Sequence, residues 1–354
     1  FRLTENGEAF NTIFTVNRLR SSSIPSDSNV VISTIQRLFS FLKGETIEDN
    51  DDDENEPIEE VTLPPNPNLP HDYFDMIIID ECHRSIYGNW RKVLEYFDTV
   101  GLTATPIPET MAFFNNNCIV NYTLEKSIVD GVNVDCRVYR IKTQVTETGG
   151  AILEGEKFKE ETRYTGEVKI VSSKETKIYT NKELNRSIIN PAQIKLVLST
   201  YRDVVYTELF NDPQREPNMD FLPKTLIFAL NEAHATNIVQ IAKEVFGRTD
   251  DRFVQKITYS AGDSNELIRQ FRNDKDFRIA VTCTLVATGT DVKPLEVVMF
   301  MRDVESLPLY IQMKGRGVRT IGDEQLRNVT PNAFSKDCFY LVDAVGVTEH
   351  AQTV

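Results

Sequence analysis

Two adjacent carboxylic acids follow an apolar stretch in MIIIDECHRS, residues 76–85. Residues 76–79 have the composition of a buried strand, and Asp80 and Glu81 come directly after it. Ligands bind beyond the carboxyl ends of strands in open parallel sheets. Because adjacent residues on an extended chain point in different directions, Asp80 can hold a hydrated Mg²⁺ while Glu81 faces an attacking water. The dipeptide alone also fits a solvated loop, so other residues are needed to distinguish a catalytic site from a loop.

A second candidate set occurs in YIQMKGRGVR. Gln312, Arg316 and Arg319 stand at i, i+4 and i+7, so a helix would present all three on one face. Gly315 and Gly317 each weaken such a helix by about 1 kcal/mol relative to Ala. We interpret that cost as a sign that another backbone or a phosphate comes close. Planar guanidinium groups suit a phosphate charge, although two arginines on a helix also fit a solvated surface.

The elements that must position these residues alternate between strand and helix. Apolar stretches predict strands at residues 30–32, 76–79, 99–104, 225–229, 278–282, 297–300 and 339–342. Helices are expected around residues 90–97, from 191 through 205, from 232 to 246 and from 263 through 271. Strands that are apolar on both faces and alternate with helices predict a parallel sheet covered by helices.

The texture changes between residues 138 and 182, where alternating and β-branched residues predict β-hairpins or an irregular connector. We therefore expect an incomplete first domain at 1–137, a β-rich linker at 138–185, a second domain at 186–346 and a tail at 347–354. The stretch from 45 to 60 holds ten acidic residues and no basic one, and we interpret it as a solvated surface insert.

Composition narrows the class of protein. The net charge is −14, but without residues 45–60 the chain has 39 basic and 43 acidic residues, so nucleic acid is not excluded as a partner. The sequence has no apolar run of membrane-spanning length. Its five scattered cysteines include no C-x-x-C pair, which argues against a zinc site or a disulfide framework and favours a cytoplasmic protein.

The segment D-E-C-H after an apolar strand resembles the Walker B element, motif II, of superfamily 2 helicases and translocases. The resemblance implies that Asp80 positions Mg²⁺ and that Glu81 polarises the hydrolytic water. It also implies that His83 links the nucleotide site to the next motif. GLTATP resembles motif III, in which Thr103 and Thr105 relay the nucleotide state to the nucleic-acid groove.

Two later segments resemble the nucleotide-binding motifs of the same superfamily. ATGTDVKPLEVV is similar to motif V, which assigns Gly289 and Asp291 to the nucleotide. YIQMKGRGVR is similar to motif VI, which adds Gln312. By this resemblance Arg316 and Arg319 reach across an interdomain cleft as arginine fingers on the γ-phosphate. We therefore expect these guanidinium groups and the motif II acids to face one another across one gap.

The resemblance also implies contacts to a DNA backbone. VVISTIQRL is similar to motif Ib and places Thr34, Gln36 and Arg37 near DNA. Motif V adds Thr288, and residues 224–229 are similar to motif IV. Motifs Ib, II, III, IV, V and VI occur in that order along the chain.

The stretch FDMIIIDECHRSIYGNWRKVLEYFDTVGLTATP closely resembles the motor of the R (HsdR) subunit of type I restriction enzymes, and the likeness extends over nearly the whole chain. It implies an α/β protein with two RecA-like parallel-sheet domains and a β-rich connector. It also implies ATP and Mg²⁺ as cofactors, with double-stranded DNA and the methylation and specificity subunits as partners.

The sequence departs from this family in one important respect. No G-x-x-x-x-G-K-[ST] loop occurs, and only some thirty residues precede Thr34. We expect the first RecA-like domain to be truncated at its N-terminus and the family's nuclease domain to be absent. Because the P-loop binds phosphates through backbone N–H groups and a lysine, we expect no useful ATP hydrolysis by this chain alone.

Two other functions remain open. The chain could be a DNA-repair or RNA helicase of the same superfamily, which would separate strands instead of tracking intact duplex. It could also be a non-catalytic nucleic-acid or protein-binding module. The retention of Asp80, Glu81, Arg316 and Arg319 argues against that module, because a decayed site need not keep them.

Overall fold

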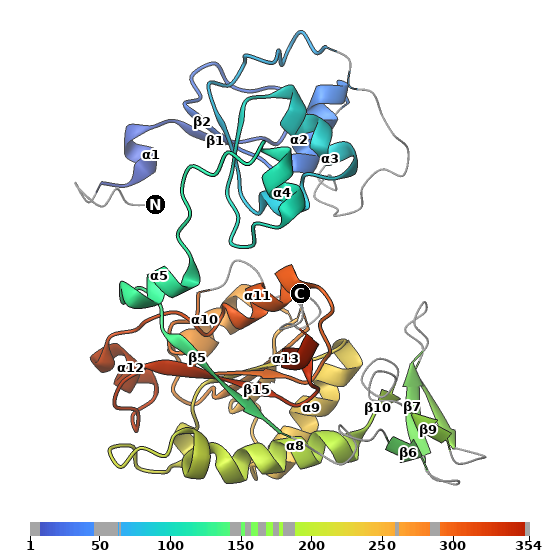
Figure 1. The fold of residues 1–354 in the computed structure, drawn as a ribbon, viewed down its shortest axis with the longest axis vertical. Helices are drawn as coiled ribbons and strands as arrows, with labels where there is room; N and C mark the ends of the chain where they lie inside the picture. Colours follow the sequence, from blue (N-terminus) through green and yellow to red (C-terminus); the bar gives the residue numbers. More distant parts are fainter. Residues whose placement is uncertain are drawn as a thin grey trace. The chain divides into compact units, whose positions relative to one another are not determined.

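The structure is a computed structural model that describes residues 8–45, 63, 65–141, 150–152, 157–161, 168–172, 177–179, 188–258, 262–283 and 291–350. The chain divides into two compact units, Phe1–Val120 and Asn121–Val354 (Figure 1). No helix in the described part of the chain is long and apolar enough to cross a membrane. Most of the acidic insert, residues 46–60, lies outside the described residues.

The first unit contains two pairs of parallel strands and several short helices. Its strands are β1 (Val16–Arg18), β2 (Val30–Ile32), β3 (Ile77–Ile79) and β4 (Thr99–Gly101), and β1 pairs with β2 while β3 pairs with β4. Its helices are α1 (Phe10–Ile13), α2 (Ile35–Lys43), the 3₁₀ turn Cys82–Arg84, α3 (Gly88–Tyr96) and α4 (Pro108–Phe113). Strand β1 was not expected from the sequence.

Helices α2 and α3 form the core of the first unit. The side chains of Phe39, Leu42 and Leu94 are all at least 97% buried, and Phe39 makes an edge-to-face contact with Trp90. Removing such apolar area from water is the main stabilising term of a small core. Gly44 ends α2 in the left-handed conformation that favours glycine, with φ of 77°.

The second unit is built on a six-stranded parallel sheet with the order β12-β13-β11-β14-β15-β5. The strands are β5 (Asp135–Arg140), β11 (Thr225–Phe228), β12 (Val254–Lys256), β13 (Ile279–Thr282), β14 (Val297–Phe300) and β15 (Cys338–Asp343). The expected parallel sheet is confirmed. The expected strands at 225–229, 278–282, 297–300 and 339–342 correspond to β11, β13, β14 and β15.

Helices cover both faces of this sheet (Figure 1). One face packs against α8 (Pro191–Val204) with its π-helical turn Val205–Leu209, and against α9 (Glu232–Val245). The other face packs against α10 (Ser264–Asn273) and α11 (Leu307–Lys314). The remaining short helices are α5 (Leu124–Val129), the 3₁₀ turn Met219–Phe221, α12 (Asp323–Val329) and α13 (Val347–His350).

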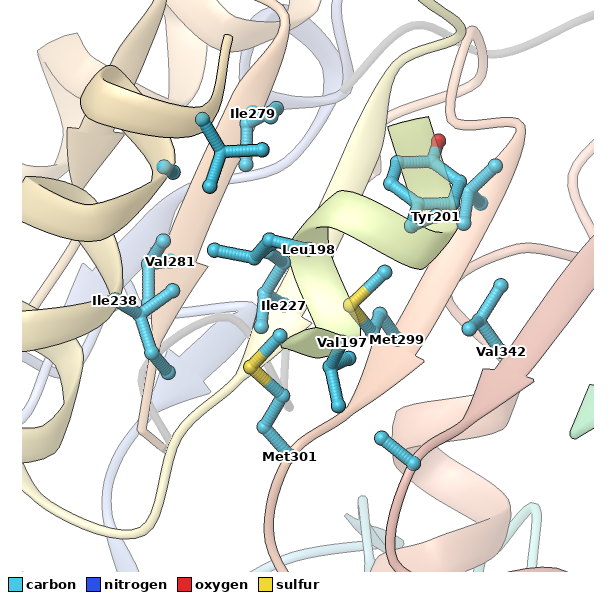
Figure 2. Packing of buried hydrophobic residues seen from close by; sticks show 14 of the residues in the cluster. Val197, Leu198, Tyr201, Ile227, Ile238, Ile279, Val281, Met299, Met301 and Val342 are labelled. Carbon is cyan, nitrogen blue, oxygen red and sulfur yellow. The ribbon is translucent and has the colours of Figure 1, made fainter. Parts of the chain in front are cut away.

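Helix α8 begins where the sequence predicts. Asn190 caps its first turn by accepting from the backbone N–H groups of Ala192 and Gln193, and Pro191 occupies the first helical position. The apolar residues Ile194, Val197, Leu198 and Tyr201 of this helix are buried. Figure 2 shows Val197, Leu198 and Tyr201 packed over the strand residues Ile227 and Met299.

After β5, the predicted β-rich connector at 138–185 contains four short strands within the described residues, and a fifth follows just beyond its predicted end. They are β6 (Gly150–Ile152), β7 (Lys157–Glu161), β8 (Val168–Ser172), β9 (Lys177–Tyr179) and β10 (Ile188–Ile189). Strand β7 pairs antiparallel with β8 and β10, and β6 pairs antiparallel with β9.

Strand β5 differs from the expected domain organisation. The predicted boundary at residue 137 falls inside it, and residues 138–140 belong to the six-stranded sheet and not to a hairpin. The reason is that β5 pairs in parallel with β15 over the whole of both strands. The predicted tail also begins inside the fold, because Val347 is fully buried and Thr348 bonds to Asp343.

Candidate nucleotide site

Strands β3 and β4 bring two sequence motifs to the same edge. Ile79 pairs with Gly101, so the residues that follow each strand emerge side by side. The chain continues this pairing beyond the strands: Leu102 N–H donates to the Ile79 carbonyl at 2.8 Å, and Cys82 N–H donates to the Leu102 carbonyl at 3.0 Å. The segments that carry Asp80 and Thr103 are therefore fixed to each other through their backbones.

Gly101 is the residue that allows this approach. A Cβ atom at this position would lie 2.7 Å from Cys82 Sγ and 2.7 Å from the ring of Phe114. Both contacts are closer than real Cβ atoms come to their neighbours. The motif II and motif III segments can therefore pack together only because residue 101 has no side chain.

The two acids differ from the extended arrangement expected for them. Strand β3 ends at Ile79, and Glu81 has a left-handed backbone with φ of 51° and ψ of 41°. Such a conformation is uncommon for a residue other than glycine and is concentrated at functional sites. Asp80 Oδ1 accepts the Glu81 N–H at 3.0 Å. A tight turn, and not strand alternation, sets the positions of the two carboxylates.

The donor set at this turn fits Mg²⁺ held by one carboxylate. Asp80 is exposed, and carboxylate oxygen is a ligand that Mg²⁺ prefers. Within the described residues, no group of three or more His, Cys, Asp or Glu side chains gathers as a metal cage. Mg²⁺ keeps several waters and takes phosphate oxygens from its substrate, so one protein carboxylate suffices.

His83 joins the two motifs through its Nδ1 atom. This atom lies 2.9 Å from Thr103 Oγ1, 3.3 Å from Thr105 Oγ1 and 3.4 Å from Glu81 Oε2. The Thr105 N–H also donates to Thr103 Oγ1 at 3.0 Å. His83 is 6% exposed, and this burial lowers the pKa of its imidazole, which is therefore neutral at pH 7. His83 thus contacts both hydroxyls of motif III, and its role in linking the two motifs stays a prediction.

The second unit brings together one acid of motif V and one arginine of motif VI. Arg319 Nε lies 3.9 Å from Asp291 Oδ1, and both side chains are about half exposed. Both residues lie at the amino edge of the sheet: Asp291 precedes β14, and Arg319 forms a bridge with Asn133, which precedes β5. Thr288 and Gly289 lie outside the described residues.

The predicted single helical face for motif VI is wrong. Helix α11 ends at Lys314, so of the three predicted residues only Gln312 is helical. Arg316 lies in the turn that follows, and its Nε donates to the Gln312 carbonyl at 3.3 Å. The two glycines terminate the helix, because Gly315 is its C-cap and Gly317 packs directly against the Phe339 ring.

Gly317 was correctly expected to mark a close approach, but the approaching group is different. The group is an aromatic ring of β15 and not a phosphate or another backbone. A Cβ atom at residue 317 would overlap three ring atoms of Phe339. Gly317 therefore lets the motif VI segment lie against the sheet.

The proposed DNA-contacting residues of motif Ib have roles inside the first unit. Thr34 caps α2 by accepting from the Arg37 N–H at 3.4 Å. The Arg37 side chain is 6% exposed and donates to the Leu19 carbonyl at 3.1 Å. Gln36 is partly exposed. The geometry therefore favours a structural role for Arg37 over a contact with a DNA phosphate.

Lys336 is a residue that sequence analysis missed. It is 6% exposed, and its Nζ atom donates to the carbonyls of Lys293 and Arg319 at 2.8 and 2.7 Å. These carbonyls belong to the segments that carry Asp291 and Arg319. Main-chain acceptors carry no residue-type signal, so nothing in the sequence around Lys336 marks this contact.

Comparison with known proteins agrees with the motif pattern. The family described as "Type III restriction enzyme, res subunit" matches residues 2–108. The EcoAI endonuclease subunit of a type I restriction enzyme, from Escherichia coli, is 30% identical over 264 residues. The EcoKI endonuclease subunit of Escherichia coli K12 is 27% identical over 350 residues. The chain is an HsdR-like, superfamily 2 helicase-like protein.

A solved structure supports the fold of this HsdR-like chain. It is a fragment described as an HsdR subunit of a type I restriction enzyme from Vibrio vulnificus YJ016, with a TM-score of 0.61 and 20% identity. The match covers 97% of this chain and 53% of that one. The two curated relatives are matched over 70% and 89% of this chain, which spans only 30% and 26% of their lengths. The RecA-like α/β fold class is thereby confirmed.

Proposed function

We propose that this chain is the motor core of a type I restriction enzyme R subunit, which uses ATP hydrolysis to translocate double-stranded DNA. The observation that carries the proposal is the contact of His83 with Glu81, Thr103 and Thr105 at the carboxyl edge of β3 and β4. Through His83, the acid that could activate water, Glu81, is connected to the two hydroxyl groups of motif III. The names of the two curated relatives, both type I endonuclease subunits, support the same role.

The first unit would supply the hydrolytic groups. Asp80 is the exposed carboxylate that would hold Mg²⁺ through water, and Mg²⁺ when bound neutralises charge on the phosphates. Glu81 would accept a hydrogen bond from the attacking water and orient it. Because the His83 imidazole is neutral, its Nδ1 atom can either accept a hydrogen bond from one threonine hydroxyl or donate one to the Glu81 carboxylate, so the two contacts would exclude each other.

The second unit would supply the phosphate-binding cations. Arg316 and Arg319 would bind the γ-phosphate, because a planar guanidinium group donates paired hydrogen bonds to phosphate oxygens. Asp291 would orient Arg319, since the two side chains lie 3.9 Å apart. Gln312 and Gly289 would complete the nucleotide contacts.

Duplex DNA and two further subunits are the proposed macromolecular partners. Thr34, Gln36 and Thr288 would contact the DNA backbone, with Arg37 supporting α2 from inside. Such phosphate contacts make affinity fall steeply with salt. The methylation and specificity subunits would select the site, and the complex would act in the cytoplasm.

The test uses the protein expressed from its complete gene and reconstituted with the methylation and specificity subunits, because no P-loop sequence occurs in these 354 residues. Translocation is measured as displacement of a third strand from intact duplex, and ATP hydrolysis is measured in parallel. Glu81→Gln should lower hydrolysis by about 100-fold or more. Glu95→Gln is the matched control, since Glu95 is half exposed and pairs with Arg91 one helical turn away.

Three outcomes would contradict the proposal. Full hydrolysis by Glu81→Gln would remove Glu81 from the reaction. Separation of a tailed duplex without triplex displacement would identify a strand-separating helicase instead. DNA binding with no hydrolysis by the reconstituted wild-type complex would identify a binding module.

A further inference from the structure

Lys336 lies in the loop between α12 and β15 and connects two segments that are distant in sequence. Its Nζ atom donates to the Lys293 carbonyl at 2.8 Å and to the Arg319 carbonyl at 2.7 Å. Lys293 follows Asp291 by two residues, and Arg319 is itself the second arginine of motif VI. One buried amine therefore connects the backbones that carry this acid and this arginine.

The side-chain pair cannot make that connection by itself. The Arg319 and Asp291 side chains are 54% and 51% exposed and lie 3.9 Å apart. Exposed pairs of this kind contribute little, because solvent screens them and two long side chains must be ordered. The Arg319 segment is held on another side by the Val134 N–H, which donates to the Val318 carbonyl at 2.8 Å. Lys336 provides the connection toward Asp291.

The surroundings of Lys336 favour a fixed contact. The charged or titratable groups that influence its amine are Glu296, Asp291 and Cys338. Burial lowers the pKa of the Lys336 amine to about 7. The amine keeps two N–H donors after it loses a proton, so both protonation states can satisfy the two carbonyls. The connection therefore does not depend on the charge of the amine.

We propose that Lys336 is a positioning residue that holds Asp291 and Arg319 in register for nucleotide binding. The expected effect of Lys336 on ATP affinity rests on the proposed function of the second unit. Its effect on the backbone positions of the two segments does not rest on that function. Lys336 itself contacts main-chain carbonyls and not the nucleotide.

The structural test is hydrogen exchange on this 354-residue chain. Lys336→Met keeps the aliphatic stem and removes both donors, and amide exchange of residues 131–135 and 317–321 should rise about tenfold. Lys224→Met is the matched control: Lys224 is also buried and donates to two carbonyls, those of Asp274 and Phe277, each at 2.7 Å. The control should leave exchange of those two peptides unchanged.

Lys336→Arg is a second variant should Lys336→Met fail to fold. It retains N–H donors and should raise exchange of the same peptides by about threefold, because the larger head strains the contact. Unchanged exchange in the folded Lys336 variants would overturn the proposal. An equal rise in Lys224→Met would also overturn it, since the effect would then be global loosening.

The functional test uses the reconstituted complex described above. Lys336→Met should raise the KM for ATP about tenfold with little change in kcat, as expected when binding is weakened equally in ground and transition states. Arg319→Ala separates the two proposals. If Arg319→Ala raises KM and Lys336→Met does not, the positioning role is wrong. If Arg319→Ala changes neither constant, the assigned role of motif VI is wrong instead.

Discussion

The Nδ1 atom of His83 lies 2.9 Å from the Oγ1 atom of Thr103, across 20 residues of intervening sequence. The same nitrogen is 3.4 Å from Glu81 Oε2. A neutral imidazole can make one strong hydrogen bond at this atom, as donor or as acceptor according to its tautomer. The Glu81 carboxylate and the Thr103 hydroxyl therefore compete for a single atom.

Replacement of both threonine hydroxyls should uncouple hydrolysis from translocation. In Thr103→Val/Thr105→Val the imidazole loses both hydroxyl partners while side-chain shape is nearly kept. ATP hydrolysis in the reconstituted complex should stay within about threefold of wild type. Triplex displacement should fall about tenfold or more, because each of the two lost hydrogen bonds contributes about 0.5–1.5 kcal/mol.

Thr110→Val is the matched control for this pair. Thr110 is also buried in the first unit, and its Oγ1 has no hydrogen-bond partner within the described part of the chain. The control should hydrolyse ATP and translocate as the wild type does. Parallel loss of both activities in the Thr103/Thr105 variant would show that these residues act in hydrolysis and not in coupling.

Gly317→Ala should destabilise the second unit. The added methyl group would overlap the Phe339 ring, which is fully buried, and overpacking of this kind costs about 1–3 kcal/mol. The free energy of unfolding is measured by urea denaturation. Gly322→Ala is the control, because a Cβ atom there meets nothing within 4 Å and φ is −67°. Equal stability of the two variants would show that Phe339 can move aside.

The contribution of the ion pair between Arg215 and Glu296 to the free energy of unfolding should require both side chains. The pair is 4% and 1% exposed, with a donor–acceptor distance of 2.6 Å. Removing one partner, as in Glu296→Gln, leaves a buried charge without its counter-ion and should lower the free energy of unfolding by about 3–5 kcal/mol. Arg215→Met/Glu296→Leu should cost less than the sum of the two single replacements, measured as a double-mutant cycle.

The exposed pair of Lys195 and Glu244 is the control for that cycle. Its side chains are 55% and 62% exposed, so Glu244→Gln should change stability by less than about 0.5 kcal/mol. Additive effects at Arg215 and Glu296 would contradict a coupled buried pair.

The two buried lysines should make stability rise with pH above neutrality. Burial lowers the pKa of Lys224 to about 6 and of Lys336 to about 7, whereas an unfolded lysine titrates near 10.4. Between these values the unfolded state binds more protons, so the free energy of unfolding increases with pH. Each Lys→Met replacement should reduce this slope between pH 7 and 8.5 by about 1 kcal/mol per pH unit.

Urea denaturation at several pH values measures the slope. Lys195→Met is the control, since Lys195 is 55% exposed and should leave the slope as it is. An identical slope for the wild type and both buried-lysine variants would place these amines in the charged state throughout the range.

The central strands of the second unit could be predicted from the sequence because their residues are buried on both faces. β11, β13 and β14 are buried at every position, and apart from Thr225 and Thr282 all their residues are apolar. Helix α8 could be located because Asn190 and Pro191 mark its start. These signals are local, and no distant partner is needed to recognise them.

Strand β5 could not be predicted for the opposite reason. It lies at the sheet edge, and four of its six residues are exposed, so it lacks the continuous apolar stretch of a central strand. Its hydrogen-bond partner lies some two hundred residues away. Strand β1 was missed because two of its three residues are polar.

Part of the candidate site followed from residue types and part did not. The contact of His83 with Thr103 and Thr105 agreed with the motif order. The end of α11 at Lys314 could not be predicted from the i, i+4, i+7 spacing. The residue that packs against Gly317 is Phe339, which is distant in sequence. Lys336 was missed because its acceptors are main-chain carbonyls.

The pairing of β5 with β15 means that one edge of the sheet can form only after most of the chain has been synthesised. Arg137 pairs with Tyr340, 203 positions further along the chain, so the edge strand is synthesised long before its neighbour. Contacts of such high sequence separation slow folding, and until β15 arrives β5 can pair only with other chains or remain solvated. A shortened protein that starts after the inserted strands β6 to β10 would leave the backbone of β15 open, as a template for aggregation.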